Sequence, residues 1–342
     1  MNREISLPGV LSHDELVATA ESIAALQLSN GMIPWFPGGH CDPWNHVETA
    51  MALDTMGFHH EARLAYGWLA DIQRSDGSWH NYYLPDGGIE DAKLDTNVCA
   101  YVAAGLWHHW LCTGDLSTVS SLWPVARAAI EWVLGLRRAD GTVLWAREVD
   151  ELPWDYALLT GSSSIRHSLR CTAMLAALLD DHPDRYLRAA DAIDHVVRTD
   201  LSAFAPKERW AMDWYYPVMT GTMEGSQAKD RLASLWDTFV MDGLGVRCVS
   251  DEPWVTAAET AECALAHAAL GDTSTARTLL SWTRPHRNDD GSYTTGLVHP
   301  EGIPFPENER TAYTAAAIIL AVDSTVGASP GSRLFKHGGL DR

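Results

Sequence analysis

Apolar residues recur at helical spacing over most of the chain, and short polar loops separate the segments that they form. Ser12 and Glu15 have the spacing of a capping box, and Asp42 followed by Pro43 has that of an N-cap with proline at the first helical position. The pattern predicts twelve helices. It sets bounds for eleven of them, near residues 13–28, 43–57, 59–74, 93–111, 117–137, 162–180, 184–200, 224–241, 254–270, 273–284 and 308–325.

The helices come in pairs, because six times along the chain a helix-sized apolar segment runs into a short loop and then into a second helix. The loops lie at residues 27–33, 72–79, 136–143, 197–204, 241–247 and 287–293. Five of them turn at a glycine, namely Gly31, Gly77, Gly141, Gly245 and Gly291, whereas the fourth copy is degenerate. Copies spaced about 45 to 65 residues apart are typical of stacked helical hairpins.

The two helices of a pair differ in composition. The second is rich in small residues, as in VCAYVAAGL (98–106), and the first carries more Arg, Glu and Asp. Small residues on all sides suit a helix that is crowded by neighbours, whereas a charged stripe suits one that faces water. The sequence therefore predicts an all-α fold, an (α/α)6 toroid with an inner and an outer ring, in a single domain over residues 1–342. We expect a flexible tail over 327–342 and short strands in the glycine loops, for example at 142–148.

The overall composition narrows the range of partners. A formal net charge of −20 argues against nucleic acid or an anionic membrane. No apolar run approaches the roughly 18 residues of a membrane span, and the first residues lack the apolar segment of a signal peptide. The six cysteines are scattered without CxxC pairs, so we expect reduced, packed thiols and a cytoplasmic location. The oligomeric state stays open, with a homo-oligomer as one option.

The candidate chemistry follows from the ring. All inner helices run in one direction, so their N-termini and the loops before them meet at one end. Acids and aromatic residues gather at these positions, and 15 of the 342 residues are Trp. Two carboxyl groups and flat faces for sugar rings are what glycoside hydrolysis requires, so we expect an oligo- or polysaccharide as substrate. The candidates for substrate binding are Trp44, His46, Glu48, Tyr82, Asp155, Asp213, Trp214, Trp254, Glu259 and Glu309.

Glu262 is the strongest catalytic candidate. It lies inside an Ala/Cys/Leu helix, three residues after Glu259 and on the same face, where burial would raise its pKa and suit it to general acid catalysis. The second repeat faces the fifth across a ring of six, which places Asp95 opposite Glu262. The first repeat faces the fourth, which places Asp42 opposite Asp213 and Glu224. Asp95 or Asp42 is therefore the expected catalytic partner, although both could equally serve as helix N-caps.

Other kinds of site find little support. The pairs His59-His60 and His108-His109 are adjacent within helices and point to different sides, so we expect structural roles and no metal site. The chain has no GxSxG elbow, P-loop or dinucleotide fingerprint, so we expect no cofactor. The serine-rich run at 160–169 could bind sugar hydroxyls or an anion, or could only cap a helix.

Two segments resemble known toroid families. WLADIQRSDGSW (68–79) is similar to the repeat motif of squalene and oxidosqualene cyclases, with Leu69, Gln73, Gly77 and Trp79 at the expected spacing. The acidic DxDD motif of the cyclases and the zinc ligands of prenyltransferase β-subunits are absent, so this resemblance implies a fold and no chemistry. GGHCDPWNHVETAMAL (38–53) is similar to a segment of glucoamylase-like hydrolases, which implies that Asp42 grips a sugar. Their third-repeat acid has no counterpart at 160–169, so their catalytic pair cannot be transferred.

The chain as a whole resembles the methylmannose polysaccharide hydrolases of actinobacteria, through its length and the segments DPWNHVE (42–48) and ETAECA (259–264). The resemblance implies an (α/α)6 fold and endo-acting α-1,4-mannosidase activity on a cytoplasmic polysaccharide, with a helix-borne Glu such as Glu262 as a catalytic residue. Toroidal hydrolases are mostly inverting, which favours inversion here. The alternatives are an isoprenoid cyclase or prenyltransferase-like toroid, a sugar epimerase and a non-catalytic sugar-binding protein.

Overall fold

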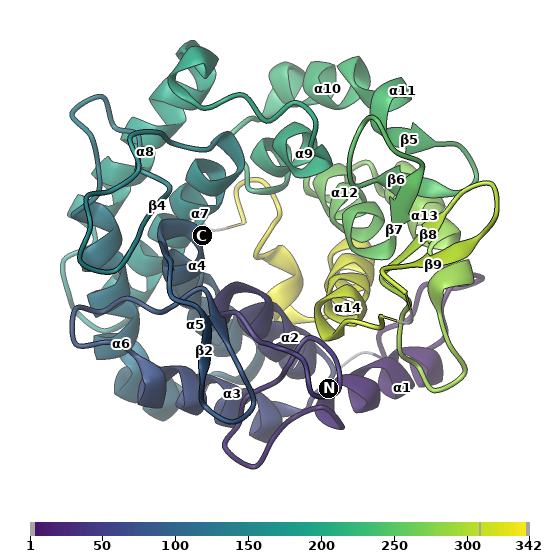
Figure 1. Ribbon diagram of the computed structural model, residues 1–342, viewed down its shortest axis with the longest axis horizontal. Helices are drawn as coiled ribbons and strands as arrows, with labels where there is room; N and C mark the ends of the chain where they lie inside the picture. The colour runs from purple at the N-terminus through teal and green to yellow at the C-terminus, as the bar shows by residue number, and fades with distance from the viewer. Residues whose placement is uncertain (1–3, 308, 340–342) are drawn as a thin grey trace.

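The fold is a closed double ring of helices. The computed structural model describes residues 4–307 and 309–339, and Figure 1 views it down the axis of the ring. Each inner helix packs against the two inner helices beside it, and the last of them packs against the first. The (α/α)6 toroid predicted from the repeats is therefore confirmed. The inner helices are α2 (Pro43–Thr55), α5 (Val102–Thr113), α7 (Leu159–Leu178), α9 (Ala211–Met219), α12 (Ala257–Ala269) and α14 (Ala312–Val326).

The outer helices cover the inner ring and face solvent on their other side (Figure 1). Their burial follows the composition: all of α12 except Glu259 is buried, whereas the outer helix α8 buries a single stripe of residues. Small side chains let the inner helices approach one another closely, and charged residues keep the outer face in water. The outer helices are α1 (His13–Ala24), α3 (His59–Ile72), α6 (Leu116–Leu134), α8 (Asp184–Thr199), α10 (Gly225–Ser234) and α13 (Thr273–Trp282).

The glycine loops lock neighbouring repeats together. Gly77 has a φ of 92°, and a Cβ there would lie 2.5 Å from the carbonyl oxygen of Ala128 on α6, so only glycine fits. Gln73 donates from Nε2 to the carbonyl oxygens of Gly77 and Val125, both at 2.9 Å, and so joins its own loop to the next outer helix. Gly291 makes the equivalent approach to the backbone of α1 at Ala18, which closes the ring between the last and the first repeat.

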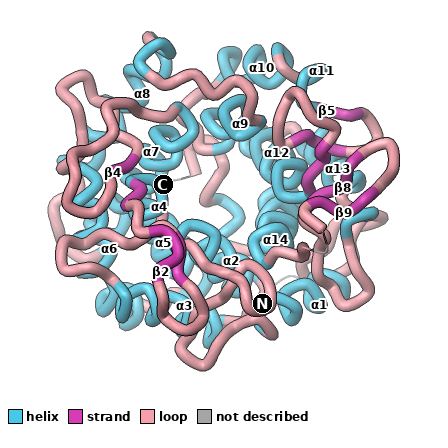
Figure 2. Tube along the Cα trace, viewed as in Figure 1, coloured by secondary structure: helices cyan, strands magenta, loops and turns pink. Residues whose placement is uncertain are grey.

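Short strands occupy the loops at the rim (Figure 2). A five-stranded antiparallel sheet, in the order β5-β6-β7-β8-β9, lies beside α12, and β7 leads directly into that helix. The two-stranded sheets β1-β2 and β3-β4 lie in the second and third repeats, and β4 confirms the strand expected within 142–148. The strands are β1 (Tyr82–Tyr83), β2 (Ile89–Asp91), β3 (Leu94–Asp95), β4 (Ala146–Arg147), β5 (Val240–Met241), β6 (Gly245–Arg247), β7 (Trp254–Thr256), β8 (Gly296–Val298) and β9 (Ile303–Phe305).

Three details differ from the sequence prediction. The expected helix 224–241 is divided into α10, a short helix α11 (Trp236–Phe239) and strand β5. The periodicity did not delimit α9, which is only 9 residues long and contains Pro217. The inner helix of the second repeat is preceded by a separate turn, α4 (Thr96–Ala100). Short 3-10 helices complete the structure at Leu201–Ala203, Arg284–His286 and Pro330–Arg333.

The expected flexible tail is packed over its described part, residues 327–339. Leu334 and Phe335 are 1% and 5% exposed, and His337 Nε2 lies 2.7 Å from the carbonyl oxygen of Val218 at the end of α9. Figure 1 shows this segment crossing the middle of the ring. The Gly/Ser/Lys composition suggested disorder, but the two apolar side chains lose their contact with water by plugging the open end of the toroid.

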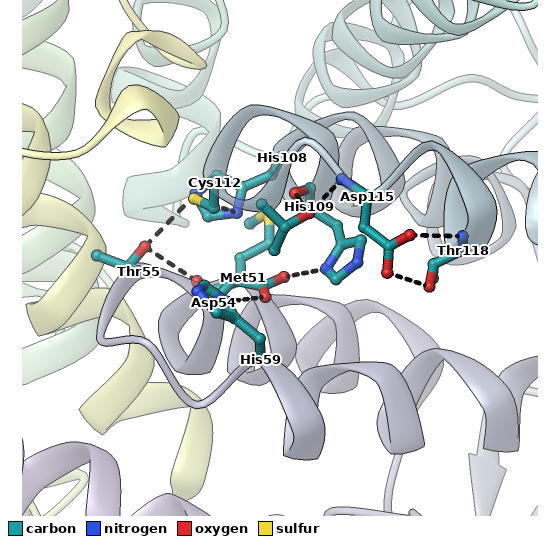
Figure 3. A network of polar contacts seen from close by, with 10 residues as sticks. Met51, Asp54, Thr55, His59, His108, His109, Cys112, Asp115 and Thr118 are labelled. Atoms are coloured by element: carbon teal, nitrogen blue, oxygen red, sulfur yellow. Dashed lines mark hydrogen bonds and ion pairs between the residues drawn. The ribbon is translucent and has the colours of Figure 1, made fainter. Parts of the chain in front are cut away.

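A buried polar network joins α2, α3 and α5 on the side away from the loops (Figure 3). The carboxylate of Asp54 lies 2.8 Å from His109 Nδ1 and 3.0 Å from His59 Nδ1. Burial raises the pKa of Asp54, but the bonds to His109 and His59 outweigh it and leave the pKa below its ordinary value. His108 Nε2 lies 3.4 Å from Thr55 Oγ1. These three histidines thus have the structural role expected from the sequence.

We expect Asp54→Ala to lower the free energy of unfolding by about 3 kcal/mol or more, because it leaves the buried His109 without its partner. Asp115→Ala is the matched control, since Asp115 caps α6 through Thr118 N at 3.0 Å and should cost only about 1 kcal/mol. Urea unfolding of both variants measures the difference. Equal losses would contradict the role given to the network.

Candidate active site

A cavity of about 340 Å³ lies at the N-terminal ends of the inner helices. Helix α2, the loop before α4 and helices α9, α12 and α14 all contribute to its lining. Seven of the predicted site residues line it: Asp42, Trp44, Glu48, Tyr82, Asp95, Glu259 and Glu262. The remaining lining residues are Trp35, Asn45, Asn81, Lys93, Asn97, Val98, Met212, Ala258 and Tyr313. The structure therefore brings five carboxyl groups and four aromatic rings to one hollow.

Asp42 is both an N-cap and a lining residue. Its Oδ1 accepts from Asn45 N at 3.0 Å, and its Oδ2 accepts from Asn45 Nδ2 and Trp35 Nε1, both at 2.7 Å. Burial raises the pKa of Asp42, while these N–H donors oppose the rise. Because every donor favours the ionised form, Asp42 is suited to accept a proton or to bind sugar hydroxyls.

Asp95 has a parallel arrangement. Its Oδ1 caps α4 by accepting from Asn97 N at 2.9 Å and Val98 N at 3.2 Å, and its Oδ2 accepts from the indole of Trp145. Burial raises the pKa of Asp95, and the charge of Lys93 acts in the opposite direction. The capping expected for Asp42 and Asp95 is confirmed, and it leaves both carboxylates at the cavity wall.

Glu262 lies on α12 with a different set of neighbours. It is 5% exposed, and Tyr215 donates a short hydrogen bond to its Oε2. Burial raises the pKa of Glu262 far above its ordinary value, and the nearby carboxylates of Glu48 and Glu259 raise it further. This direction favours the protonated form of Glu262, which is the form that a general acid needs.

Glu48 interacts electrostatically with both Asp42 and Glu262. It lies on α2, and its Oε1 accepts from Tyr101 OH at 3.1 Å. Burial raises the pKa of Glu48 to about 8, and the carboxylate of Asp42 contributes to the rise. The carboxylate of Asp42 thus raises the pKa of Glu48, and that of Glu48 raises the pKa of Glu262. Asp95 is not among the charges that shift either pKa.

The mouth of the cavity is aromatic. Trp35 makes edge contacts with Tyr82 and Tyr313, with ring centroids 5.7 Å and 4.9 Å apart. Trp44 stacks on Tyr101 at 4.8 Å and is 9% exposed. Such rings can hold a sugar through its C–H face.

Three predicted residues lie outside this cavity. His46 is buried, with Nδ1 accepting from Ile33 N at 3.3 Å and Nε2 lying 2.9 Å from the carbonyl oxygen of Ala65. The side chain of Asp155 is 96% exposed and pairs with Arg138, so it faces solvent. Asp213 lines a separate hollow next to Trp210 and accepts from Thr160 Oγ1 at 3.2 Å.

The remaining three predicted site residues are Trp214, Trp254 and Glu309, and each contacts residues of its own neighbourhood. Trp214 is 1% exposed, stacks on Phe239 at 5.5 Å and donates from Nε1 to the carbonyl oxygen of Arg231, so it belongs to the core. Trp254 stacks on Phe305 within the five-stranded sheet. Glu309 is half-buried, and its backbone oxygen accepts from Thr295 N at 3.1 Å. None of the three lines the cavity, and Asp42 does not face Asp213 and Glu224 across it.

Several lining residues were not among the candidates. Tyr313 and Met212 are each the second residue of an inner helix. Their position at the start of that helix could therefore have identified them. Lys93 gives no such signal, because it lies on a loop, with its Nζ 4.8 Å from the centre of the Trp145 ring. Within residues 4–307 and 309–339, no group of three or more His, Cys, Asp or Glu side chains is arranged to hold a metal ion. Over the same residues, no helix is long and apolar enough to cross a membrane.

Solved structures share the fold. A glycosidase in complex with glucose superposes with a TM-score of 0.74 at 16% identity, covering 93% of this chain and 97% of its own. The cellobiose 2-epimerase from Spirochaeta thermophila has a TM-score of 0.69 at 13% identity, covering 92% and 96%. The GH63 mannosylglycerate hydrolase from Thermus thermophilus, in complex with glucose, has a TM-score of 0.64 at 12% identity, covering 90% and 99%.

The sequence comparison is more specific. No protein-family model matches the chain. The MMP endo-(1,4)-3-O-methyl-alpha-D-mannosidase of Mycolicibacterium hassiacum is 44% identical over 336 residues, which cover 98% of this chain and 93% of that protein. Identity at this level over nearly the full length of both proteins, together with the toroid and its carboxylate-lined cavity, shows that the chain belongs to the family of this endo-mannosidase, a family of glycoside hydrolases.

Proposed function

We propose that the protein is an endo-acting α-mannosidase that hydrolyses internal α-1,4 linkages of a 3-O-methylated mannan, with inversion at the anomeric carbon. The observation that carries the proposal is a buried Glu262, whose pKa burial raises, in one cavity with four further carboxyl groups, in a chain closely similar to an endo-(1,4)-3-O-methyl-mannosidase. The proposal includes a cytoplasmic location, which the six free cysteines favour.

Glu262 would donate its proton to the glycosidic oxygen as the bond to the anomeric carbon breaks. Asp42 would take a proton from the water that attacks the opposite face of the sugar ring. Inversion requires the two carboxyl groups to be about 6.5–9.5 Å apart, so that this water fits between Asp42 and the sugar. Asp95 and Glu259 would bind hydroxyl groups on either side of the scissile bond.

The lining also contains apolar side chains among the acids. Val98, Met212 and Ala258 offer surfaces on which a methyl ether can be buried without losing a hydrogen bond. A hydroxyl in the same place would lose hydration and gain no partner. This supports a preference for the 3-O-methylated sugar over unmodified mannose.

The test of the function is product analysis. The enzyme is incubated with α-1,4-linked 3-O-methylmannose oligosaccharides, with unmethylated α-1,4-mannooligosaccharides, and with a prenyl diphosphate. We expect shortened oligosaccharides from the first, slower cleavage of the second, and β-configured new ends in proton NMR at early times. Products from the prenyl diphosphate alone would overturn the proposal in favour of a cyclase, and binding of sugar without products would indicate a sugar-binding protein.

We expect Glu48→Gln to shift the alkaline limb of the kcat/KM profile to lower pH, by about one unit. An ionised Glu48 raises the pKa of Glu262, so its removal lets Glu262 lose its proton at lower pH. The pKa of Glu48 rises from 4.5 in the unfolded chain to about 8 in the fold, so the folded state binds more protons and stability falls as pH increases across this range. In Glu48→Gln the free energy of unfolding should decrease less as pH increases across this range. An unchanged pH limb would contradict the coupling.

A further inference from the structure

Tyr215 contacts the carboxyl group of Glu262 without lining the cavity itself. It lies on α9, which packs against α12 in the inner ring (Figure 1), and its side chain is fully buried. Glu262 is among the residues that line the central cavity, and Tyr215 is not. The hydroxyl of Tyr215 donates a short hydrogen bond to Glu262 Oε2, so the two inner helices are joined at the carboxyl group on which the chemistry depends.

The two carboxyl oxygens of Glu262 have different surroundings. Oε2 is occupied by the bond from Tyr215. Oε1 has no hydrogen-bond partner within the described part of the chain, and it is not one of the buried polar atoms that are closed off from solvent without a partner. Because Glu262 lines the central cavity, Oε1 is the oxygen that opens to it.

The bond from Tyr215 also decides which oxygen carries the proton when Glu262 is neutral. A phenol hydroxyl has one hydrogen, and among the described residues Glu262 Oε2 is the acceptor that it has. A proton on Oε2 would point at the phenol oxygen and leave the hydrogen of the buried Tyr215 without an acceptor, which is unfavourable. The proton is therefore best placed on Oε1, on the side of the cavity.

We propose that Tyr215 is a positioning residue for the general acid, which donates to Glu262 Oε2 and so holds the proton of Glu262 on Oε1, where it meets the glycosidic oxygen. The inference rests on the proposed role of Glu262 in the reaction. Once the proton has moved to the glycosidic oxygen, the same hydrogen bond stabilises the carboxylate that is left, because a bond to an ionised acceptor is stronger than one to a neutral acceptor.

The groups around Glu262 set the direction of a pH test. Glu48 on α2 and Glu259 on α12 raise the pKa of Glu262, and the bond from Tyr215 lowers it. Loss of the Tyr215 hydroxyl should therefore raise the pKa of Glu262, which is opposite to the effect expected for Glu48→Gln. Three more titratable side chains interact with Glu262 and stay neutral because burial raises their pKa values, namely Tyr101, Tyr216 and Cys263.

The test is Tyr215→Phe in the full-length enzyme, with α-1,4-linked 3-O-methylmannose oligosaccharides as substrate. We expect kcat to fall by about tenfold with little change in KM, and the alkaline limb of the kcat/KM profile to move to higher pH by about one unit. Activity on a mannobiosyl fluoride should be retained, because the departing fluoride needs no proton. A purely structural role of Tyr215 would lower both activities alike and leave the alkaline limb in place, which would overturn the inference.

Tyr293→Phe is the matched control. Tyr293 is also fully buried, its hydroxyl makes no hydrogen bond within the described residues, and it lies in the loop at 287–293, outside the cavity lining. This variant should leave kcat and the alkaline limb unchanged.

A carbon NMR titration of the Glu262 carboxyl group, assigned by its loss in Glu262→Gln, measures the pKa without turnover. It should give a higher pKa in Tyr215→Phe than in the unmodified enzyme. An unchanged pKa and an unchanged kcat in Tyr215→Phe, with Glu262→Gln inactive, would overturn the inference and leave the proposed function standing. Normal turnover by Glu262→Gln would instead remove the proposed role of Glu262 on which the inference rests.

Discussion

Glu262→Gln should lower kcat on α-1,4-linked 3-O-methylmannose oligosaccharides by about a thousandfold or more, with little change in stability. Gln has the shape of a protonated Glu, so it keeps the bond from Tyr215, and it removes a carboxyl group whose pKa burial raises far above its ordinary value. The free energy of unfolding should therefore stay equal or rise at neutral pH. Turnover would fall because no proton reaches the leaving oxygen.

A substrate that needs no acid separates the role of Glu262 from a general loss of binding. The fluoride ion of a mannobiosyl fluoride leaves without being protonated. Glu262→Gln should therefore retain much of its activity on this substrate. Glu301→Gln, an exposed acid on the loop between β8 and β9, is the control and should behave as the unmodified enzyme. A normal rate of Glu262→Gln on the natural linkage would remove Glu262 from the mechanism. Equal losses on both substrates would make it the base.

Asp42→Asn should lower kcat by about a hundredfold to ten-thousandfold on both the oligosaccharide and the fluoride, because water activation is required for both. Asn is as good an N-cap as Asp, so α2 should remain stable and the loss can be assigned to chemistry. Kinetics with both substrates and a thermal melt measure the two effects separately.

Asp95→Asn is the matched comparison, since Asp95 also caps a helix, α4, and also accepts from a Trp indole. We expect it to raise KM more than it lowers kcat, as a residue that binds hydroxyl groups would. A larger loss of kcat for Asp95→Asn than for Asp42→Asn would exchange the two assignments. The paired design therefore resolves the alternative that the sequence left open.

The repeats could be predicted from the sequence because each one is marked by a pattern of neighbouring residues. Gly31, Gly141 and Gly291 repeat the close approach of Gly77 to the backbone of a neighbouring outer helix. Gln27 repeats the two bonds of Gln73 in the first loop, to the carbonyl oxygens of Gly31 and Glu61. The fourth repeat could not be delimited in this way. Its inner helix is short and contains Pro217, and its loop has no glycine, so no local signal marked its ends.

The candidate site could be predicted only in part, for a related reason. Residues just before an inner helix or inside it, such as Asp42, Glu48 and Glu262, were found by position along the chain. Asp155 and Trp254 have the same kind of position, but Asp155 faces solvent and Trp254 stacks on Phe305 within the sheet. The direction of a loop depends on contacts between repeats, which a single sequence does not display.

The sequence by itself determined the ring, the side on which acids gather and the helix that carries Glu262, because helical period, small-residue faces and capping act over a few residues. Only the tertiary structure decided that Glu48, on another helix, lies near enough to raise the pKa of Glu262, and that the tail closes the rear of the ring. Burial and the interaction of charges depend on distances in space between residues far apart in the chain, and those distances exist only once the ring has closed.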